Sequence, residues 1–236
     1  MSLGNAIGYL TAVKVPARRQ VPLAFSLHYF PWIGAAVGSL SILVFLVTNR
    51  FLPGALSCAV AVLFPQLLAG WDPWRGLVER IQGHRTFPGH GFRPGFHFDV
   101  RALATMGIVF LVKWLALVSL SLDWQTRAVF IFPILGYCAR TASFLIAPVK
   151  GAPASPMPSR TRVRAGFLSG FLLFLAFQFP MYVAIPILVI GASAVWALVR
   201  RENRLAHGLT LQTASCASEL AEVITLVSLA VAAAFH

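Results

Sequence analysis

Long apolar stretches with few or no charged side chains recur along this chain of 236 residues. They cover about 28–49, 51–71, 102–122, 127–148, 165–199 and 209–235. A helix needs about 20 predominantly apolar residues to cross the hydrocarbon core of a bilayer. Only 11% of the side chains are charged, whereas a soluble domain carries about 25%. The pattern therefore predicts an all-α, polytopic membrane helix bundle.

The fifth stretch, 165–199, has no charged side chain. As a single helix it would be about 52 Å long, well beyond a hydrocarbon core of about 30 Å. Gln178, Pro180 and Pro186 lie near its middle, where a turn between two helices would suit them. Basic clusters flank the stretch on both sides, so it crosses an even number of times if both clusters are cytoplasmic. We therefore expect two helices here and about seven transmembrane helices in all.

The basic residues stand between the apolar stretches and do not form a basic domain. The chain carries 19 Lys and Arg against 7 Asp and Glu, a net charge of +12. This distribution favours topogenic charge, and we expect no nucleic-acid partner. A cytoplasmic N-terminus places 15 of the 19 basic residues on the inner side. These are Lys14, Arg18, Arg19, Arg75, Arg80, Arg85, Arg93, Arg101, Lys150, Arg160, Arg162, Arg164, Arg200, Arg201 and Arg204.

The outer loops then hold only Arg50 and Arg127, while Lys113 and Arg140 lie inside expected helices. This asymmetry predicts a multi-pass protein of a bacterial or archaeal cytoplasmic (inner) membrane, with its N-terminus in the cytoplasm. We expect residues 1–236 to form one integral membrane domain, with cytoplasmic loops at 72–101 and 149–164.

Cysteines and histidines do not indicate a metal site or a disulfide framework. Three cysteines, an odd number, lie inside apolar stretches: Cys58, Cys138 and Cys216. Three histidines lie in the loop 72–101 at spacings of six and seven, which match no helix face and no standard metal site: His84, His90 and His97. We therefore expect a solvated loop and no bound metal.

Two expected helices carry glycines at the small-xxx-small spacing that lets backbones approach closely, Gly34 with Gly38 and Gly166 with Gly170. The expected fifth helix also carries a phenylalanine stripe, at spacings of four, three and three. Its members are Phe167, Phe171, Phe174 and Phe177. Such a stripe suits a protein interface, the interior of the bundle or contact with lipid.

Four ionisable residues fall inside expected membrane helices: Lys113, Arg140, Glu219 and Glu222. Holding an unpaired charge at that depth costs several kcal/mol, so such residues are functional-site candidates. Glu219 and Glu222 are three apart and share one helix face. We expect an interior cluster of balanced charge, with Arg140 in reach of Glu219 or Glu222. It is either a structural ion-pair network or a ligand site.

Short motifs along nearly the whole chain resemble those of a known family. They are Leu10-Thr-Ala-Val-Lys-Val-Pro16, Phe30-Pro-Trp-Ile-Gly34, Lys113-Trp114, Ala139-Arg140, and Gly208-Leu-Thr-Leu-Gln-Thr213 followed by Glu219-Leu220 and Glu222. In this order and spacing they resemble the cobalamin synthase family, adenosylcobinamide-GDP ribazoletransferase. The resemblance implies a helix bundle of the cobalamin-synthase type.

The resemblance also implies a magnesium-dependent reaction at the cytoplasmic membrane surface. The family joins α-ribazole or its phosphate to adenosylcobinamide-GDP and releases GMP. Carboxylates hold the divalent cation against phosphate oxygens in such chemistry. The family supplies them from a loop reading Asp-Gly-Leu-Ala-Asp-Thr-x-Asp-Gly after the second helix, and from an aspartate in the C-terminal run.

In this chain the matching positions keep the glycines Gly76 and Gly83 but lose the aspartates. The three loop aspartates read Arg75, Glu79 and Gln82, and the C-terminal aspartate reads Gln212. The Asp-Ser-Arg-x-Gly element that precedes the third helix in the family is not recognisable in 94–101. A site that has lost carboxylates and gained a cation should not hold magnesium.

We therefore expect a repurposed, non-catalytic relative, a pseudoenzyme without a cofactor. It would serve as an accessory or structural subunit of a larger membrane complex, in contact with lipid and with other membrane subunits. The alternative is an active ribazoletransferase, with Asp72 and Glu79 rebuilding a magnesium site as its catalytic candidates. A transporter is a third class, but no pair of broken-helix repeats is visible in the sequence.

Overall fold

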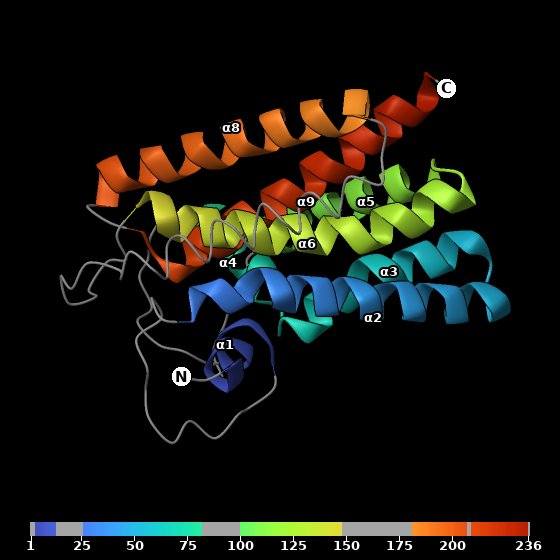
Figure 1. Cartoon of the computed structure of the whole chain (residues 1–236), viewed down its shortest axis with the longest axis horizontal. Helices are drawn as coiled ribbons and strands as arrows, with labels where there is room; N and C mark the ends of the chain where they lie inside the picture. Colours follow the sequence, from blue (N-terminus) through green and yellow to red (C-terminus); the bar gives the residue numbers. More distant parts are fainter. Residues whose placement is uncertain (1–2, 13–25, 82–99, 148–180, 207–208, 236) are drawn as a thin grey trace.

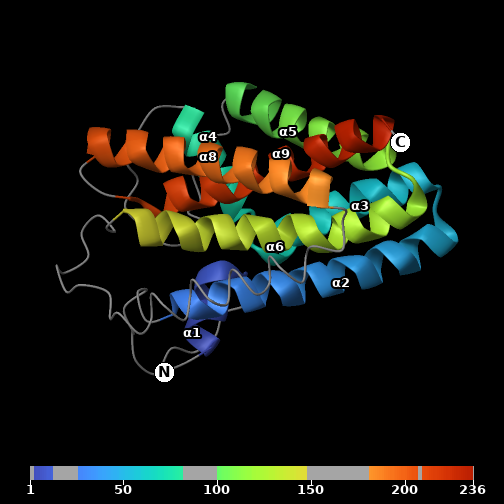
Figure 2. The same ribbon diagram turned by 45° about the horizontal axis from the view of Figure 1, so that its top comes forward.

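The computed structural model describes residues 3–12, 26–81, 100–147, 181–206 and 209–235. These residues form helices that lie side by side in a bundle (Figures 1 and 2). In chain order they are α1 (Leu3–Leu10), the 3-10 helix η2 (Leu27–Tyr29), α2 (Phe30–Phe51), α3 (Gly54–Leu68), α4 (Asp72–Ile81), α5 (Val100–Val118), α6 (Leu122–Ile146), α8 (Met181–Ala206) and α9 (Leu211–Ala234).

Five of these segments are long and apolar enough to cross a membrane: Leu27–Phe51, Val100–Val118, Leu122–Ile146, Val183–Arg204 and Gln212–Ala234. α3 and α4 form a sixth if they are counted together as one bent span. The expected all-α, multi-pass membrane bundle is thus confirmed. The first of the two helices expected in 165–199, with its phenylalanines and with Gly166 and Gly170, lies outside the described residues.

The second helix of that stretch is α8. The structure describes it from Met181 to Ala206, and Pro186 lies inside it and not in a turn. A proline at the sixth helical position forfeits a single backbone hydrogen bond near the helix start, a loss that membrane helices tolerate. α6 and α8 run in the same direction (Figure 1), as two crossings in 165–199 would require.

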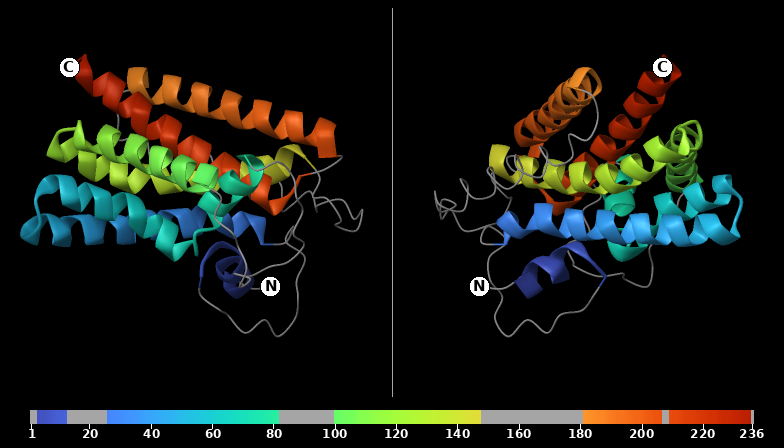
Figure 3. Two further views of the ribbon diagram at one scale, coloured as in Figure 1. Left: turned by 180° about the vertical axis from the view of Figure 1, so that it is seen from behind. Right: turned by 45° about the vertical axis from the view of Figure 1, so that its right-hand side comes forward.

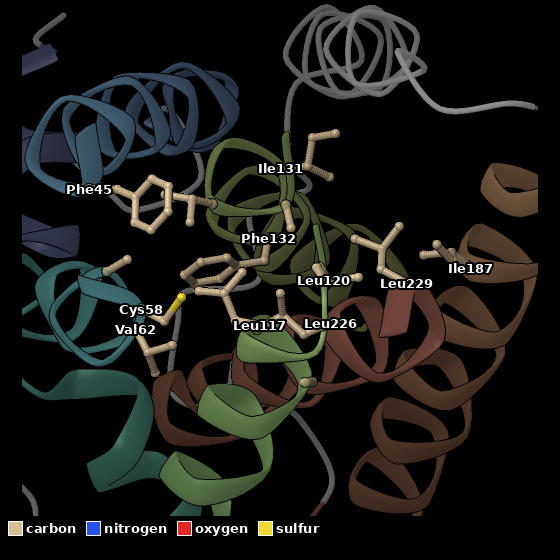
Figure 4. Close-up of a cluster of buried hydrophobic side chains, with 14 of the residues drawn as sticks. Phe45, Cys58, Val62, Leu117, Leu120, Ile131, Phe132, Ile187, Leu226 and Leu229 are labelled. Atoms are coloured by element: carbon tan, nitrogen blue, oxygen red, sulfur yellow. The ribbon is translucent and has the colours of Figure 1, made fainter. Parts of the chain in front are cut away.

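The apolar core lies between α6 and its neighbours. α6 is the most buried of the candidate spans and packs against α2, α8 and α9. Figure 4 shows Phe132 of α6 among Phe45, Leu117 and Leu226, which come from α2, α5 and α9. Lipid does not drive helices together, so close packing of this kind has to hold the bundle.

The close approach predicted for Gly34 and Gly38 is confirmed. A Cβ atom at Gly34 would lie 2.8 Å from Cβ of Tyr137, and one at Gly38 would collide with the backbone carbonyl of Phe130. Both contacts are with α6. The small-xxx-small spacing on α2 therefore sets the α2–α6 packing.

The chain turns by 86° between α3 and α4. Gly70 and Trp71 both adopt left-handed backbone conformations there, with φ of 63° and 64°, which is uncommon for a tryptophan. The backbone N–H of Trp71 donates to the carbonyl of Gln66 at 2.8 Å. α3 has only 15 residues, about 22 Å of helix, which is shorter than a hydrocarbon core of about 30 Å. The bend at its end therefore places α4 within the bundle.

The prediction of a cytoplasmic loop at 72–101 is therefore wrong at both ends of that range. Residues 72–81 form α4, which packs against α9, and Val100 and Arg101 begin α5. Trp74 and Val78, four residues apart, are buried on one face of α4. The three loop histidines lie outside the described residues, as does the whole of the loop expected at 149–164.

The ends of the described chain lie at opposite ends of the bundle, with α1 at one and the last turn of α9 at the other (Figure 3). The arginines at the end of α8 lie at the end near α1, whereas Arg50 lies in the last turn of α2, at the other. By the positive-inside rule, we expect a cytoplasmic N-terminus and an external C-terminus.

Reporter fusions at the C-terminus test this orientation. Alkaline phosphatase, which is active only outside the cytoplasm, should be active there, and green fluorescent protein, which folds in the cytoplasm, should be dark. The same reporters fused after Arg204 serve as a matched control and should give the reverse result. A fluorescent C-terminal fusion would contradict the orientation.

Candidate functional site

Two carboxylates on α9 meet a lysine from α5 in the interior of the bundle. Glu219 and Glu222 share a face of α9, and Lys113 lies opposite them. Lys113 Nζ donates to Glu222 Oε2 at 2.7 Å and also forms an ion pair with Glu219. None of the three residues is more than 2% exposed. The predicted interior cluster therefore has a core of one cation and two acids.

Gln66 and Trp74 also donate hydrogen bonds to the Glu219 carboxylate. The sequence analysis predicted neither residue as a member of the cluster. Gln66 Nε2 donates to Glu219 Oε2 at 2.9 Å, and Trp74 Nε1 donates to Glu219 Oε1 at 3.0 Å. Gln66 lies in the last turn of α3 and Trp74 in the first turn of α4. The bend thus brings two hydrogen-bond donors to one carboxylate. A sequence interpreted as a loop gives no indication of these two contacts.

Gly136 on α6 provides the space for Glu222. A Cβ atom at Gly136 would collide with Glu222 Oε1 and would lie 2.8 Å from Ser218 Oγ. Any larger side chain here would push the carboxylate of Glu222 away from Lys113. α6 thus contributes the space that a glycine leaves at position 136.

Arg140 forms no direct salt bridge with Glu219 or Glu222 within the described residues. Its salt bridge within the described part of the chain is to Asp72, with 3.9 Å between Arg140 Nη2 and Asp72 Oδ2. Arg140 Nη2 also donates to Ser215 Oγ at 2.8 Å, and that hydroxyl donates to Asp72 Oδ2 at 3.4 Å. The expected four-residue cluster is therefore two neighbouring sets, one around Lys113 and one around Arg140.

The second set lies nearer the surface than the first. Arg140 is 3% exposed, but the Asp72 side chain is 45% exposed. Asp72, one of the two residues that would rebuild a metal site in the alternative of an active enzyme, thus already faces a buried cation. Its place in the first turn of α4 also suits the positive end of the helix dipole.

α4 packs closely against α9 at Gly76, a glycine of the matching motif. A Cβ atom at Gly76 would lie 2.5 Å from the carbonyl oxygen of Gln212 and 2.9 Å from Cβ of Ser215. Arg75 precedes this glycine, and Glu79 lies in the following turn of α4. Gln82 and Gly83 are outside the described residues. Gly76 of the first half of the motif thus packs against Gln212 of the second half.

Within the described ranges no group of three or more His, Cys, Asp or Glu side chains is placed to hold a metal ion. The arrangement instead joins five helices by buried polar contacts. Such contacts are strong only when every charge has a partner, because the surroundings have a low dielectric constant.

Removing the cation of the first set should destabilise the protein strongly. Lys113→Met leaves the Glu219 and Glu222 carboxylates facing each other, and we expect a loss of about 3 kcal/mol. Adding Glu222→Gln should recover part of it, because Glu219 keeps Gln66 and Trp74 as donors. All three cysteines are buried, so thermal unfolding in detergent can be followed by thiol labelling.

Leu111→Met, at an exposed position of the same helix, is the matched control and should unfold like the wild type. A single Lys113→Met variant as stable as wild type would contradict the proposed energetics. So would a double variant no more stable than that single one.

Comparison with known proteins gives matches of the family suggested by the motifs. A family model described as cobalamin-5-phosphate synthase matches residues 2–73. Two curated adenosylcobinamide-GDP ribazoletransferases, from Shewanella baltica (strain OS195) and Shewanella oneidensis, are 32% and 29% identical over 129 and 128 residues. No solved structure gives a significant match.

Each of these alignments covers 50% of this chain and 47% of the relative. The chain thus spans about half the length of the curated relatives it matches. The family model, the curated relatives and the apolar helical bundle agree with the order of motifs along the sequence. The chain is therefore similar to cobalamin synthases in its first 73 residues and over about half of its length.

Proposed function

We propose that this protein is a non-catalytic relative of cobalamin synthase that serves as an accessory or structural subunit of a larger complex in the cytoplasmic membrane. The observation that carries the proposal is the contact between α4 and α9. The resemblance assigns metal-binding aspartates to both sides of this contact. Here Arg75 lies on one side and Gln212 on the other, while Gly76 keeps the two helices close.

The chemistry of these substitutions argues against a resident divalent cation. Magnesium prefers carboxylate, phosphate and water oxygens in octahedral geometry. A guanidinium group beside the site repels such a cation, and an amide oxygen binds it more weakly than a carboxylate. Asp72 offers no simple replacement, because Arg140 and Ser215 already engage its carboxylate.

The polar interior, in contrast, is held by contacts between protein side chains. Lys113, Glu219 and Glu222 neutralise much of one another's charge, and Gln66 and Trp74 add neutral donors. These contacts favour a scaffold that keeps its shape after the reaction is lost. A membrane scaffold of this kind can then bind partner subunits through its surface.

That surface is apolar along α5, where Leu103, Ile108, Leu111 and Leu115 are between 46% and 60% exposed. In a bilayer such a face contacts lipid or another membrane helix. The subunit proposal requires a constant partner and a fixed stoichiometry, whereas an enzyme requires exchange of substrates at an open site.

The first test is catalytic. Purified protein with magnesium, α-ribazole and adenosylcobinamide-GDP should release no GMP above background, because of Arg75, Gln82 and Gln212. The Shewanella baltica relative, purified in the same way, is the positive control, and the thermal unfolding midpoint verifies that the protein is folded. Turnover abolished by Glu79→Ala would establish the alternative, an active ribazoletransferase.

The second test concerns assembly. After extraction with a mild detergent, the chain should migrate on a native gel with other membrane proteins in a constant ratio. The same extract solubilised in dodecyl sulfate provides the size of the isolated chain. Migration alone, or only as a homo-oligomer, would contradict the accessory-subunit function.

A further inference from the structure

The last two turns of α8 carry three exposed arginines, Arg200, Arg201 and Arg204. The acidic residue among them, Glu202, is fully buried. The exposed surface of these turns is therefore strongly basic. None of the three arginines belongs to the polar clusters around Lys113 and Arg140.

Contacts with α9 fix the rotation of this part of α8. Val195, Val199 and Glu202 are buried at spacings of four and three, so they form one helix face. Glu202 Oε2 accepts a hydrogen bond from Thr213 Oγ1 at 3.4 Å, near the start of α9. With this face held against the bundle, Arg200 and Arg204 lie on the outward side.

The outward side continues as an apolar stripe toward the opposite end of α8. Ile185, Val189 and Trp196 are about half exposed, and they lie on the same face as Arg200 and Arg204. The Arg200 guanidinium carbon lies 4.8 Å from the centre of the Trp196 ring. Tryptophan and arginine in this arrangement are typical of the boundary between hydrocarbon and headgroups.

A ligand that covers this stripe needs an apolar part about three helical turns long and an anionic group at one end. A nucleic acid or an acidic soluble protein offers the charge without the apolar part. A phospholipid offers both, and an arginine fork matches the geometry of a phosphate. The arginines lie at the end of the bundle near α1, the end predicted to face the cytoplasm (Figure 1).

We propose that the end of α8 is a binding site for an anionic phospholipid of the inner leaflet. The headgroup phosphate binds Arg200, Arg201 and Arg204, the Trp196 ring holds Arg200 in place, and an acyl chain lies along Val189 and Ile185. The site is independent of whether the protein is an enzyme or a subunit.

Native mass spectrometry of the full chain in detergent tests this site. Phosphatidylglycerol and phosphatidylcholine with identical acyl chains are added as probes. Phosphatidylglycerol should bind about tenfold more tightly, because juxtamembrane arginines each add to the affinity for anionic lipid. The triple variant Arg200→Gln/Arg201→Gln/Arg204→Gln should lose this preference, and Arg204→Gln alone should reduce it by an intermediate factor.

Arg50→Gln is the matched control, because Arg50 is exposed in the last turn of α2, at the opposite end of the bundle. This variant should keep the full preference for phosphatidylglycerol. Equal binding of the two lipids by wild type would overturn the proposal. So would an unchanged preference in both the triple and the Arg204→Gln variants, or an equal loss in Arg50→Gln. Binding of free glycerol 3-phosphate as tight as that of the lipid would identify a site for a soluble anion and would also overturn it.

Discussion

The buried contact of Lys113 with Glu219 and Glu222 is the interaction on which the arrangement of the helices depends. At such depth an isolated charge costs several kcal/mol, and each of these side chains is tolerable only with the others in place. α5 supplies the cation, α9 the acids, α3 and α4 the neutral donors, and α6 the space at Gly136. Five helices are thus positioned by one set of polar contacts.

α4 is the element that this interaction constrains most. It is short and amphipathic, and it follows a turn in which Gly70 and Trp71 both have left-handed backbones. The bond from Trp74 to Glu219 anchors it, and the packing of Gly76 on Gln212 sets its distance from α9. Asp72 is thereby carried to Arg140. The second polar set is therefore a consequence of the first.

The sequence predicted the long helices, the contact of α2 through Gly34 and Gly38, and the members of the interior cluster, because hydrophobicity and residue spacing encode these features directly. It did not predict the pairing within the cluster. The salt bridges of Lys113 with both acids and of Arg140 with Asp72 depend on how α4, α5 and α6 are placed against α9. Spacing along α9 alone identifies a shared face and not a depth.

The sequence did not predict the bend before α4, for a different reason. Residues 72–81 have polar side chains among the apolar ones and a proline near their start, which is also the composition of a loop. In the structure they form α4, with Trp74 and Val78 buried. The groups that hold α4 in place, Trp74 and Gly76, are distinct from the positions at which the family's aspartates are replaced. A change at Arg75 or Gln212 therefore leaves the contacts of Glu219 untouched. The proposed non-catalytic role requires this separation, because contacts outside the positions that match the family's aspartates must then hold the fold.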